Sequence, residues 1–127
     1  MSTWRQKAIS CLPELKKDFE DPETTIYGVF TEMLPALVEA HKNQDTSRIR
    51  NIYDFAEWCF RQKDKDLWNS AGVSFYEHLG DRPETLLDMG RWVEPDIYAE
   101  IRGLSELRVS SEALQQLDKA YGVAARR

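Results

Sequence analysis

The chain has 127 residues, of which 42% are hydrophobic and 31% are charged, and its formal net charge is −5. This length and composition are typical of one globular domain with a sizeable core, and they exclude a largely disordered chain. The negative charge argues against a protein that grips nucleic acid by its phosphates, because that function requires a basic face.

The cysteine and hydropathy patterns exclude several other classes. Cys11 and Cys59 form no C-x-x-C pair and lie among apolar neighbours, which indicates buried thiols. The sequence is also compatible with one disulfide between them. No apolar run approaches the ~18 residues of a membrane span, and the first ten residues lack the apolar core of a signal peptide. We therefore expect a cytoplasmic protein without membrane contact.

The first helical stretch is predicted over about Thr3 to Phe19, interrupted at Pro13 because proline breaks a helix interior. A second helix is predicted from Glu23 or Thr24 to Lys42, where apolar residues recur at helical spacing. Proline 35 lies inside this second pattern, and we expect it to bend the helix about one turn upstream.

The third helix is predicted over residues 47–62, after an N-cap in the polar segment 45–47. Its segment "IYDFAEWCF" places one apolar stripe on one side, whereas Trp58 falls on nearly the opposite side. A helix that is apolar on two faces is usually buried on two sides. We therefore expect this helix to be the central element of the fold.

A fourth helix is predicted from about Asp66 to Leu79, with Gly72 allowing the close approach of another helix. A short helix is then predicted over residues 84–90, stopped at Gly90, and Pro95 is suited to open the next helix. The last helix is predicted from Ser110 to Tyr121, followed by a frayed tail at 122–127.

Taken together, these elements predict a single all-α domain that spans residues 1–127 and contains five to seven helices. Short connections between adjacent helices favour an antiparallel α-hairpin stack or an irregular bundle. Because no repeat recurs at a fixed period, any repeat character is HEAT-like at most.

Three segments carry a resemblance to a known family. They are "PEL" at 13–15 with the downstream Phe19, "AGVSFYEHL" at 71–79, and "RWVEPDIYAEI" at 91–101. With these segments the chain resembles a family of small bacterial helical proteins of unknown function. The resemblance implies an all-α fold and brings no catalytic motif. It also implies a loose association with immunity or regulatory partners in bacterial conflict loci.

No pattern of catalytic or metal-binding residues stands out. His41 and His78 are the only histidines, and neither has a zinc-ligand spacing with Cys11, Cys59 or the carboxylates. We expect His41 to be structural, at a helix end that favours positive charge, and His78 to be a half-buried packing residue. The sequence therefore predicts no metal, no cofactor and no catalytic residue, and favours a non-enzymatic protein over an enzyme.

Charge is concentrated between Glu77 and Glu106, where eight acids and three bases carry a formal charge of −5 and leave the rest of the chain neutral. Within this segment, Trp92 and Tyr98 lie close in sequence to Glu94, Asp96 and Glu100, and tryptophan and tyrosine dominate protein-binding hot spots. The alternative is that Trp92 covers the core where two helices meet. The predicted partner-binding residues are Asp88, Trp92, Glu94, Asp96, Tyr98 and Glu100.

We therefore predict a non-catalytic protein-binding module that presents an acidic helical face to a basic protein partner, in the manner of a bacterial immunity or antitoxin-like protein. One alternative is a ligand-binding or enzymatic domain whose pocket is lined by Trp58, Trp68 and Tyr76, with His78 as its polar group. A second alternative is a homo-oligomeric scaffold, and the sequence does not determine the oligomeric state.

Overall fold

The computed structural model describes residues 1–106 and 111–121, and describes side chains over the same ranges except at 103–106, 111 and 113. These residues form nine α-helical segments and no β-strand, so the all-α prediction is confirmed. The number exceeds the predicted five to seven because three of the segments are single turns. The helices are α1 (Thr3–Cys11), α2 (Lys16–Phe19), α3 (Ile26–Lys42), α4 (Thr46–Phe60), α5 (Lys65–Ser70), α6 (Pro83–Leu86), α7 (Met89–Trp92), α8 (Pro95–Glu106) and α9 (Ser111–Ala120).

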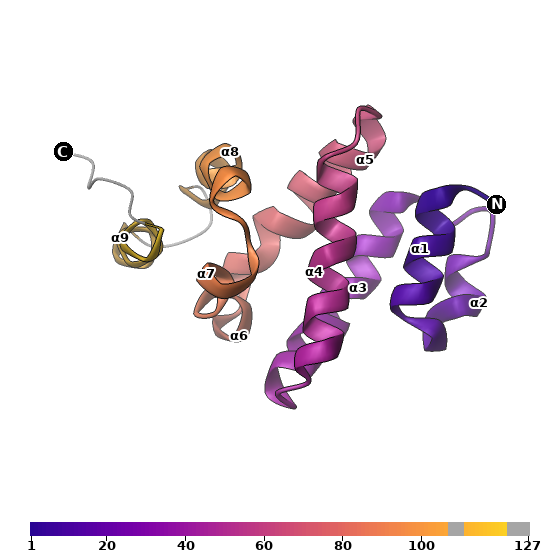
Figure 1. Cartoon of the computed structure of the whole chain (residues 1–127), viewed down its shortest axis with the longest axis horizontal. Helices are drawn as coiled ribbons and strands as arrows, with labels where there is room; N and C mark the ends of the chain where they lie inside the picture. Colours follow the sequence, from indigo (N-terminus) through magenta and orange to yellow (C-terminus); the bar gives the residue numbers. More distant parts are fainter. Residues whose placement is uncertain (107–110, 122–127) are drawn as a thin grey trace.

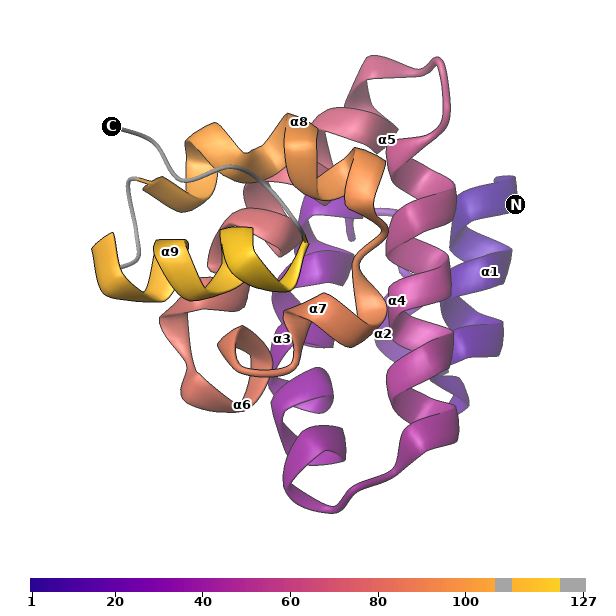
Figure 2. The same ribbon diagram turned by 60° about the vertical axis from the view of Figure 1, so that its left-hand side comes forward.

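The helices form an irregular bundle whose order in space follows the chain (Figure 1). Helices α1 and α2 lie at one end, the long pair α3 and α4 crosses the middle, and α8 and α9 lie at the other end. Figure 2 shows α3 and α4 side by side, with α6 to α9 packed over the side of this pair that is opposite α1. None of the helices in the described part of the chain is long and apolar enough to span a membrane.

The break at Pro13 is confirmed, because α1 ends at Cys11 and a short 3₁₀ turn, Pro13–Leu15, leads into α2. Arg5 of α1 binds the end of α2 and the loop that follows it. Its guanidinium donates to the carbonyl oxygens of Phe19 at 2.6 Å, Asp21 at 2.8 Å and Thr24 at 3.0 Å. Three backbone acceptors in one loop are thereby satisfied by a single side chain.

Helix α4 is central, as predicted. It begins after Asp45, whose carboxylate accepts the backbone N–H of Arg48 at 3.2 Å. Its main stripe packs against α3 and the segment after α5, whereas its second side packs against α1. Trp58, on that second side, is partly buried, and the ammonium of Lys7 lies 5.0 Å from its ring centre. The surplus apolar surface of "IYDFAEWCF" is therefore covered by α1.

The prediction of one regular helix from Asp66 to Leu79 is wrong. Helix α5 ends at Ser70 and continues as a π-helical turn, Ala71–Phe75, followed by a 3₁₀ segment, Tyr76–Asp81. Neighbouring residues of an α-helix point about 100° apart, yet Phe75 and Tyr76 are 0% and 2% exposed. The irregular turns bring both rings into the core, where Phe75 lies 5.5 Å from Phe30 and 5.7 Å from Tyr53.

The prediction that Gly90 stops a helix over residues 84–90 is also wrong. Two single turns, α6 and α7, replace that helix, and Gly90 lies inside α7. A Cβ added to Gly90 would lie 3.5 Å from the Cβ of Ala120, so α9 packs closely against this turn. The opening of α8 at Pro95 is confirmed.

Helix α9 occupies most of the predicted 110–121 span, whereas Ser110 and the predicted frayed tail, 122–127, lie outside the described residues. Tyr121 anchors the end of α9. Its hydroxyl lies within hydrogen-bonding distance of two carbonyl oxygens, that of Met89 at 3.0 Å and that of Val93 at 2.6 Å.

Candidate functional site

A cluster of polar and aromatic side chains forms where α7 and the turn before it meet the C-terminal end of α3 and the middle of α4, and we call it the Trp92 cluster. Its members are His41 in the last turn of α3, Tyr53 of α4, Asp88 in the turn between α6 and α7, and Trp92 of α7. Two of the four, Asp88 and Trp92, belong to the partner-binding set predicted from the sequence.

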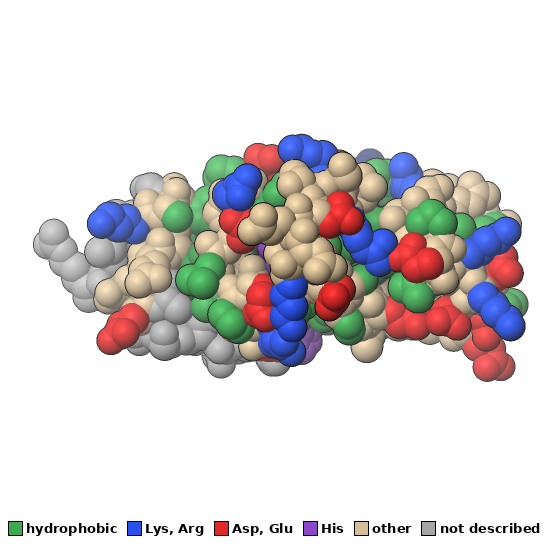
Figure 3. Space-filling view, turned by 90° about the horizontal axis from the view of Figure 1, so that it is seen from below, with side chains coloured by type: hydrophobic (Ala, Val, Ile, Leu, Met, Phe, Trp, Pro, Cys, Tyr) green, Lys and Arg blue, Asp and Glu red, His purple; other side chains and the backbone are tan. Residues whose placement is uncertain are grey.

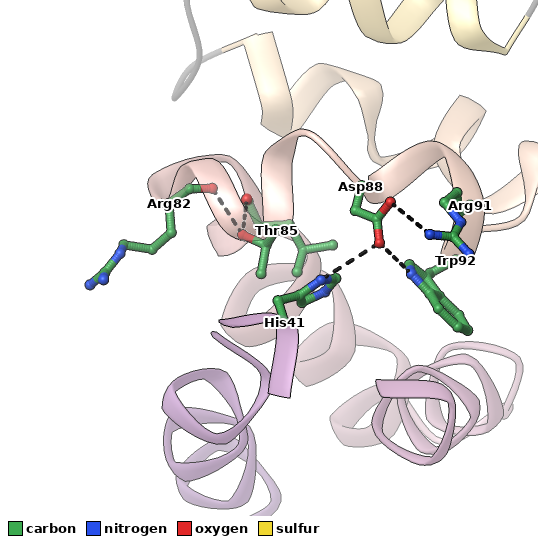
Figure 4. Close-up of polar contacts among 7 residues, drawn as sticks. His41, Arg82, Thr85, Asp88, Arg91 and Trp92 are labelled. Atoms are coloured by element: carbon green, nitrogen blue, oxygen red, sulfur yellow. Dashed lines mark hydrogen bonds and ion pairs between the residues drawn. The ribbon is translucent and has the colours of Figure 1, made fainter. Parts of the chain in front are cut away.

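Asp88 is the centre of this cluster (Figure 4). One carboxylate oxygen, Oδ2, accepts the indole N–H of Trp92 at 2.8 Å and lies 3.6 Å from Nδ1 of His41. The other oxygen, Oδ1, lies 3.6 Å from the guanidinium of Arg91. Asp88 directly precedes α7, and Trp92 is the last residue of this helix. Because the carboxylate binds the indole N–H, the position of the Trp92 ring is fixed by a residue of the same short segment.

The ring of Trp92 is held on its faces as well. It stacks on Tyr53, with ring centres 5.9 Å apart and planes 4° from parallel. The guanidinium groups of Arg50 and Arg91 lie 5.4 Å and 5.7 Å from its centre. Both arginines are exposed and Trp92 is half-buried, so this part of the surface presents an aromatic ring flanked by cations.

His41 lies beneath this surface. Its side chain is 6% exposed, and its ring meets Tyr53 edge-on at 6.3 Å. Burial lowers the pKa of His41, an effect that the negative charges of Asp88 and Glu84 oppose and do not overcome. The imidazole is therefore neutral near pH 7. The structural role of His41 stays a prediction, whereas the positive charge favoured at the end of α3 does not form near pH 7, because burial lowers the pKa of this histidine.

Three polar atoms around this cluster are buried without a hydrogen-bond partner among the described residues. They are Nε2 of His41, the hydroxyl of Tyr53 and Oε2 of Glu84. Burial also raises the pKa of Tyr53, so its hydroxyl stays protonated at any ordinary pH. An unpaired buried polar group is costly, so these three atoms lower the stability of the boundary between the α3–α4 pair and α6–α7.

The lowered pKa of His41 makes the folded chain less stable as the pH falls. The pKa of His41 in the folded chain lies below its ordinary 6.5, so the folded chain binds fewer protons than the unfolded chain as pH falls through that value. Stability contributed by neutral His41 is present above about pH 6.5 and is lost as the pH decreases toward the folded pKa.

We expect the free energy of unfolding of the wild-type chain to fall more than that of His41→Gln between about pH 7 and pH 5.5, as measured by urea denaturation. The lowered pKa values of Glu14 and Asp96 act in more acidic solution and do not enter this window. A wild-type advantage that grows on acidification would contradict this account, since it would mean that Asp88 raises the pKa of His41.

The remaining predicted partner-binding residues do not form one group. Glu94, Asp96 and Glu100 are exposed at and after the start of α8. Asp96 is held by Arg61 of the α4 end through two hydrogen bonds, at 2.8 Å and 3.2 Å, and this guanidinium lowers the pKa of the carboxyl group.

The expectation that Tyr98 contributes to a surface is wrong. Its side chain is fully buried, its ring stacks on Tyr121 at 4.0 Å, and its hydroxyl donates to Asp118 at 2.7 Å. Asp118 also accepts a hydrogen bond at 2.7 Å from Nε of Arg102, and both charged residues are buried. The hydrophobic stripe of α8 faces α9 at this point, so Tyr98 joins the two helices.

The acidic segment does not form a continuous acidic face. Four of its acids contact basic side chains in the pairs Asp81–His78, Glu84–Arg82, Asp88–Arg91 and Asp96–Arg61. Figure 3 shows acidic and basic side chains interspersed over one long face of the molecule. Among these partners only Arg61 is a cation from outside the segment, so most of the segment's negative charge remains, and Glu94 and Glu100 are exposed.

The pocket of the alternative prediction does not form as stated, because its residues lie apart. Trp58 lines a shallow groove of about 530 Å³ between α1 and α4, whereas His78 lines a different cleft beside α3. Tyr76 is buried in the core and Trp68 is 40% exposed.

The cysteines offer no nucleophile for catalysis. Cys11 and Cys59 are both free thiols, and burial raises the pKa of each to about 12, so neither forms a thiolate near pH 7. Within the described ranges, no three His, Cys, Asp or Glu side chains are placed to hold a metal ion.

Comparison with known proteins gives a family and no function. No curated protein and no solved structure matches the chain. One family model matches residues 5–108, which include the whole Trp92 cluster and all of α8. The chain therefore belongs to the family described as Domain of unknown function (DUF7674).

Proposed function

We propose that this protein is a non-catalytic protein-binding module that covers a basic surface of a protein partner, in the manner of a bacterial immunity or antitoxin protein. Its binding surface is centred on Trp92 and includes Arg50, Arg91, Glu94 and Glu100, and we call it the Trp92 surface. In this proposal the module acts in the cytoplasm.

The observation that carries the proposal is the way in which Trp92 is held. Its ring is stacked on Tyr53 and its N–H is bonded to Asp88, yet part of the ring remains at the surface between two exposed arginines. Tryptophan and arginine are the residues most enriched in binding hot spots. A ring that is already ordered loses little side-chain entropy on binding, which favours affinity.

A basic partner is inferred from the net charge of the chain, which is −5. Glu94, directly before α8, and Glu100, within α8, are among its exposed acids. The arginines lie over the aromatic ring, and in this proposal the two glutamates meet a basic partner at the rim of the surface. Charges at a rim chiefly steer association and fix orientation.

The experiment compares two double variants with the same change in net charge. The chain is used to capture partners from an extract of its native host, and the captured protein is purified. Its affinity is then measured by calorimetry for the wild type, for Glu94→Lys with Glu100→Lys, and for Glu20→Lys with Glu23→Lys. The control glutamates are exposed near α2, at the other end of the molecule.

We expect the α8 variant to weaken binding by at least about tenfold and the control variant by less than about threefold. Equal weakening by both variants would mean that net charge alone attracts the partner. Unchanged binding by the α8 variant would remove Glu94 and Glu100 from the interface, and either result contradicts the proposal.

A further inference from the structure

A cleft of about 460 Å³ lies between α3 and the segment from His78 to Thr85, away from the Trp92 surface. Its volume falls within the range of about 300–1,000 Å³ that small-molecule sites occupy. On α3 the cleft extends from Thr31 to Lys42, a length of about 16 Å at 1.5 Å per residue. The cleft therefore has the size and the elongated shape for a small extended ligand.

The floor of the cleft is apolar. Leu34, Pro35 and Val38 lie on the outer face of α3, where Leu34 and Val38 are half-buried and Pro35 is exposed. The adjacent face of the same helix is buried in the core through Phe30, Met33 and Leu37. A ligand with an apolar body would remove this outer strip from water, which is favourable in proportion to the area covered.

The acidic groups of the cleft already have partners. Asp81 contacts Nδ1 of His78 at 2.8 Å, and Glu39 accepts a hydrogen bond from Asn43 at 3.4 Å. A cationic ligand would have to compete with these partners for each carboxylate.

The basic groups of the cleft are more available. Lys42 is exposed and has no ion pair among the described residues. Arg82 has a side chain that is 54% exposed, and its contact with Glu84 is long, at 3.7 Å. Figure 4 shows the Arg82 side chain extending away from Asp88 and the rest of the Trp92 cluster. Lys42 and Arg82 are therefore the charged groups of the cleft that are most available to a ligand.

We propose that this cleft binds a small amphipathic carboxylate, a medium-chain carboxylic acid in its ionised form. Its hydrocarbon chain lies on Leu34, Pro35 and Val38, and its carboxylate accepts charge-assisted hydrogen bonds from Lys42 and Arg82. This site is separate from the Trp92 surface, so it does not depend on the proposed protein-binding function.

The test uses three ligands with the same chain and different head groups: octanoate, octanamide and octylamine. Each is titrated into the ¹⁵N-labelled full chain, and affinities are read from amide chemical shifts. We expect octanoate to bind most tightly and octylamine most weakly, with shifts concentrated in residues 31–42 and 78–85. Comparable affinity for octylamine, shifts concentrated in the groove between α1 and α4, or no saturable shift with octanoate would each overturn the proposal.

Two variants separate the charge from the apolar floor. Lys42→Gln with Arg82→Gln is expected to weaken octanoate by about tenfold and to change octanamide by less than about twofold. Val38→Glu is expected to weaken both ligands, because it places a charge on the floor. Lys63→Gln with Lys65→Gln, at exposed positions near α5, provides the matched control and is expected to change neither. Equal octanoate affinity in the Lys42/Arg82 variant and this control would also overturn the proposal.

Discussion

Replacing Asp118 with alanine is expected to lower the free energy of unfolding by about 3–5 kcal/mol, the usual cost of breaking a buried ion pair from one side. The substitution removes the carboxylate that binds both the guanidinium of Arg102 and the hydroxyl of Tyr98. Arg102 is 9% exposed and Tyr98 is 0% exposed, so water cannot readily replace the lost acceptor. Urea denaturation followed by circular dichroism measures the loss.

The neighbouring position on α9 provides a matched control for Asp118→Ala. Lys119 is exposed, and Lys119→Ala is expected to change stability by less than about 0.5 kcal/mol. A loss of less than about 1 kcal/mol for Asp118→Ala would show that the buried ion pair contributes little to holding α9, contrary to this account.

Phe75→Ala is expected to destabilise the chain by a similar amount, about 3–5 kcal/mol, because it opens a cavity at the meeting point of the aromatic core. The ring of Phe75 is fully buried and lies within 5.3–5.7 Å of the rings of Phe30, Tyr53 and Tyr76. Phe75→Leu retains most of the volume and is expected to cost less. Thermal and urea unfolding measure both.

Trp68→Ala is the control for Phe75→Ala, because it also removes a large aromatic side chain, but one that is 40% exposed. We expect it to cost less than half as much as Phe75→Ala. An equal or larger loss at Trp68 would mean that the irregular turn after α5 does not serve to bury Phe75.

Much of the fold follows from local sequence patterns. The breaks at Pro13 and Pro95 depend on the missing backbone N–H and fixed φ of proline, which act wherever the residue stands. The two-sided burial of α4 follows from helical periodicity, because Trp58 lies opposite the stripe that holds Ile52 and Tyr53. These signals are contained within a few helical turns, so they need no knowledge of the tertiary structure.

The irregular segment after α5 shows where such patterns fail. Periodicity assumes one fixed angle per residue, whereas burial of both Phe75 and Tyr76 requires a locally different one. Its π turn is set by rings from α3 and α4 that lie more than fifteen residues away in the chain. Gly72 and the adjacent aromatics were the available sequence signals, and they indicated close packing without indicating the turn.

The candidate site was predicted only in part for the same reason. The sequence pattern of an aromatic residue near acids indicates Asp88 and Trp92. These two residues are four positions apart in the chain, and the structure joins them by a hydrogen bond. Their partner His41 lies forty-seven positions earlier in the chain, and no local pattern links it to Asp88. Tyr98 was misassigned because its partners, Asp118 and Tyr121, lie on a different helix.

The most direct test of the Trp92 surface as the binding site is hydrogen exchange of the full chain, with and without the captured partner. Binding is expected to slow exchange at amides 88–100 and at the indole N–H of Trp92, with no change in α1 and α2. Protection confined to α1 and α2, with the Trp92 indole exchanging as in the isolated chain, would contradict the account.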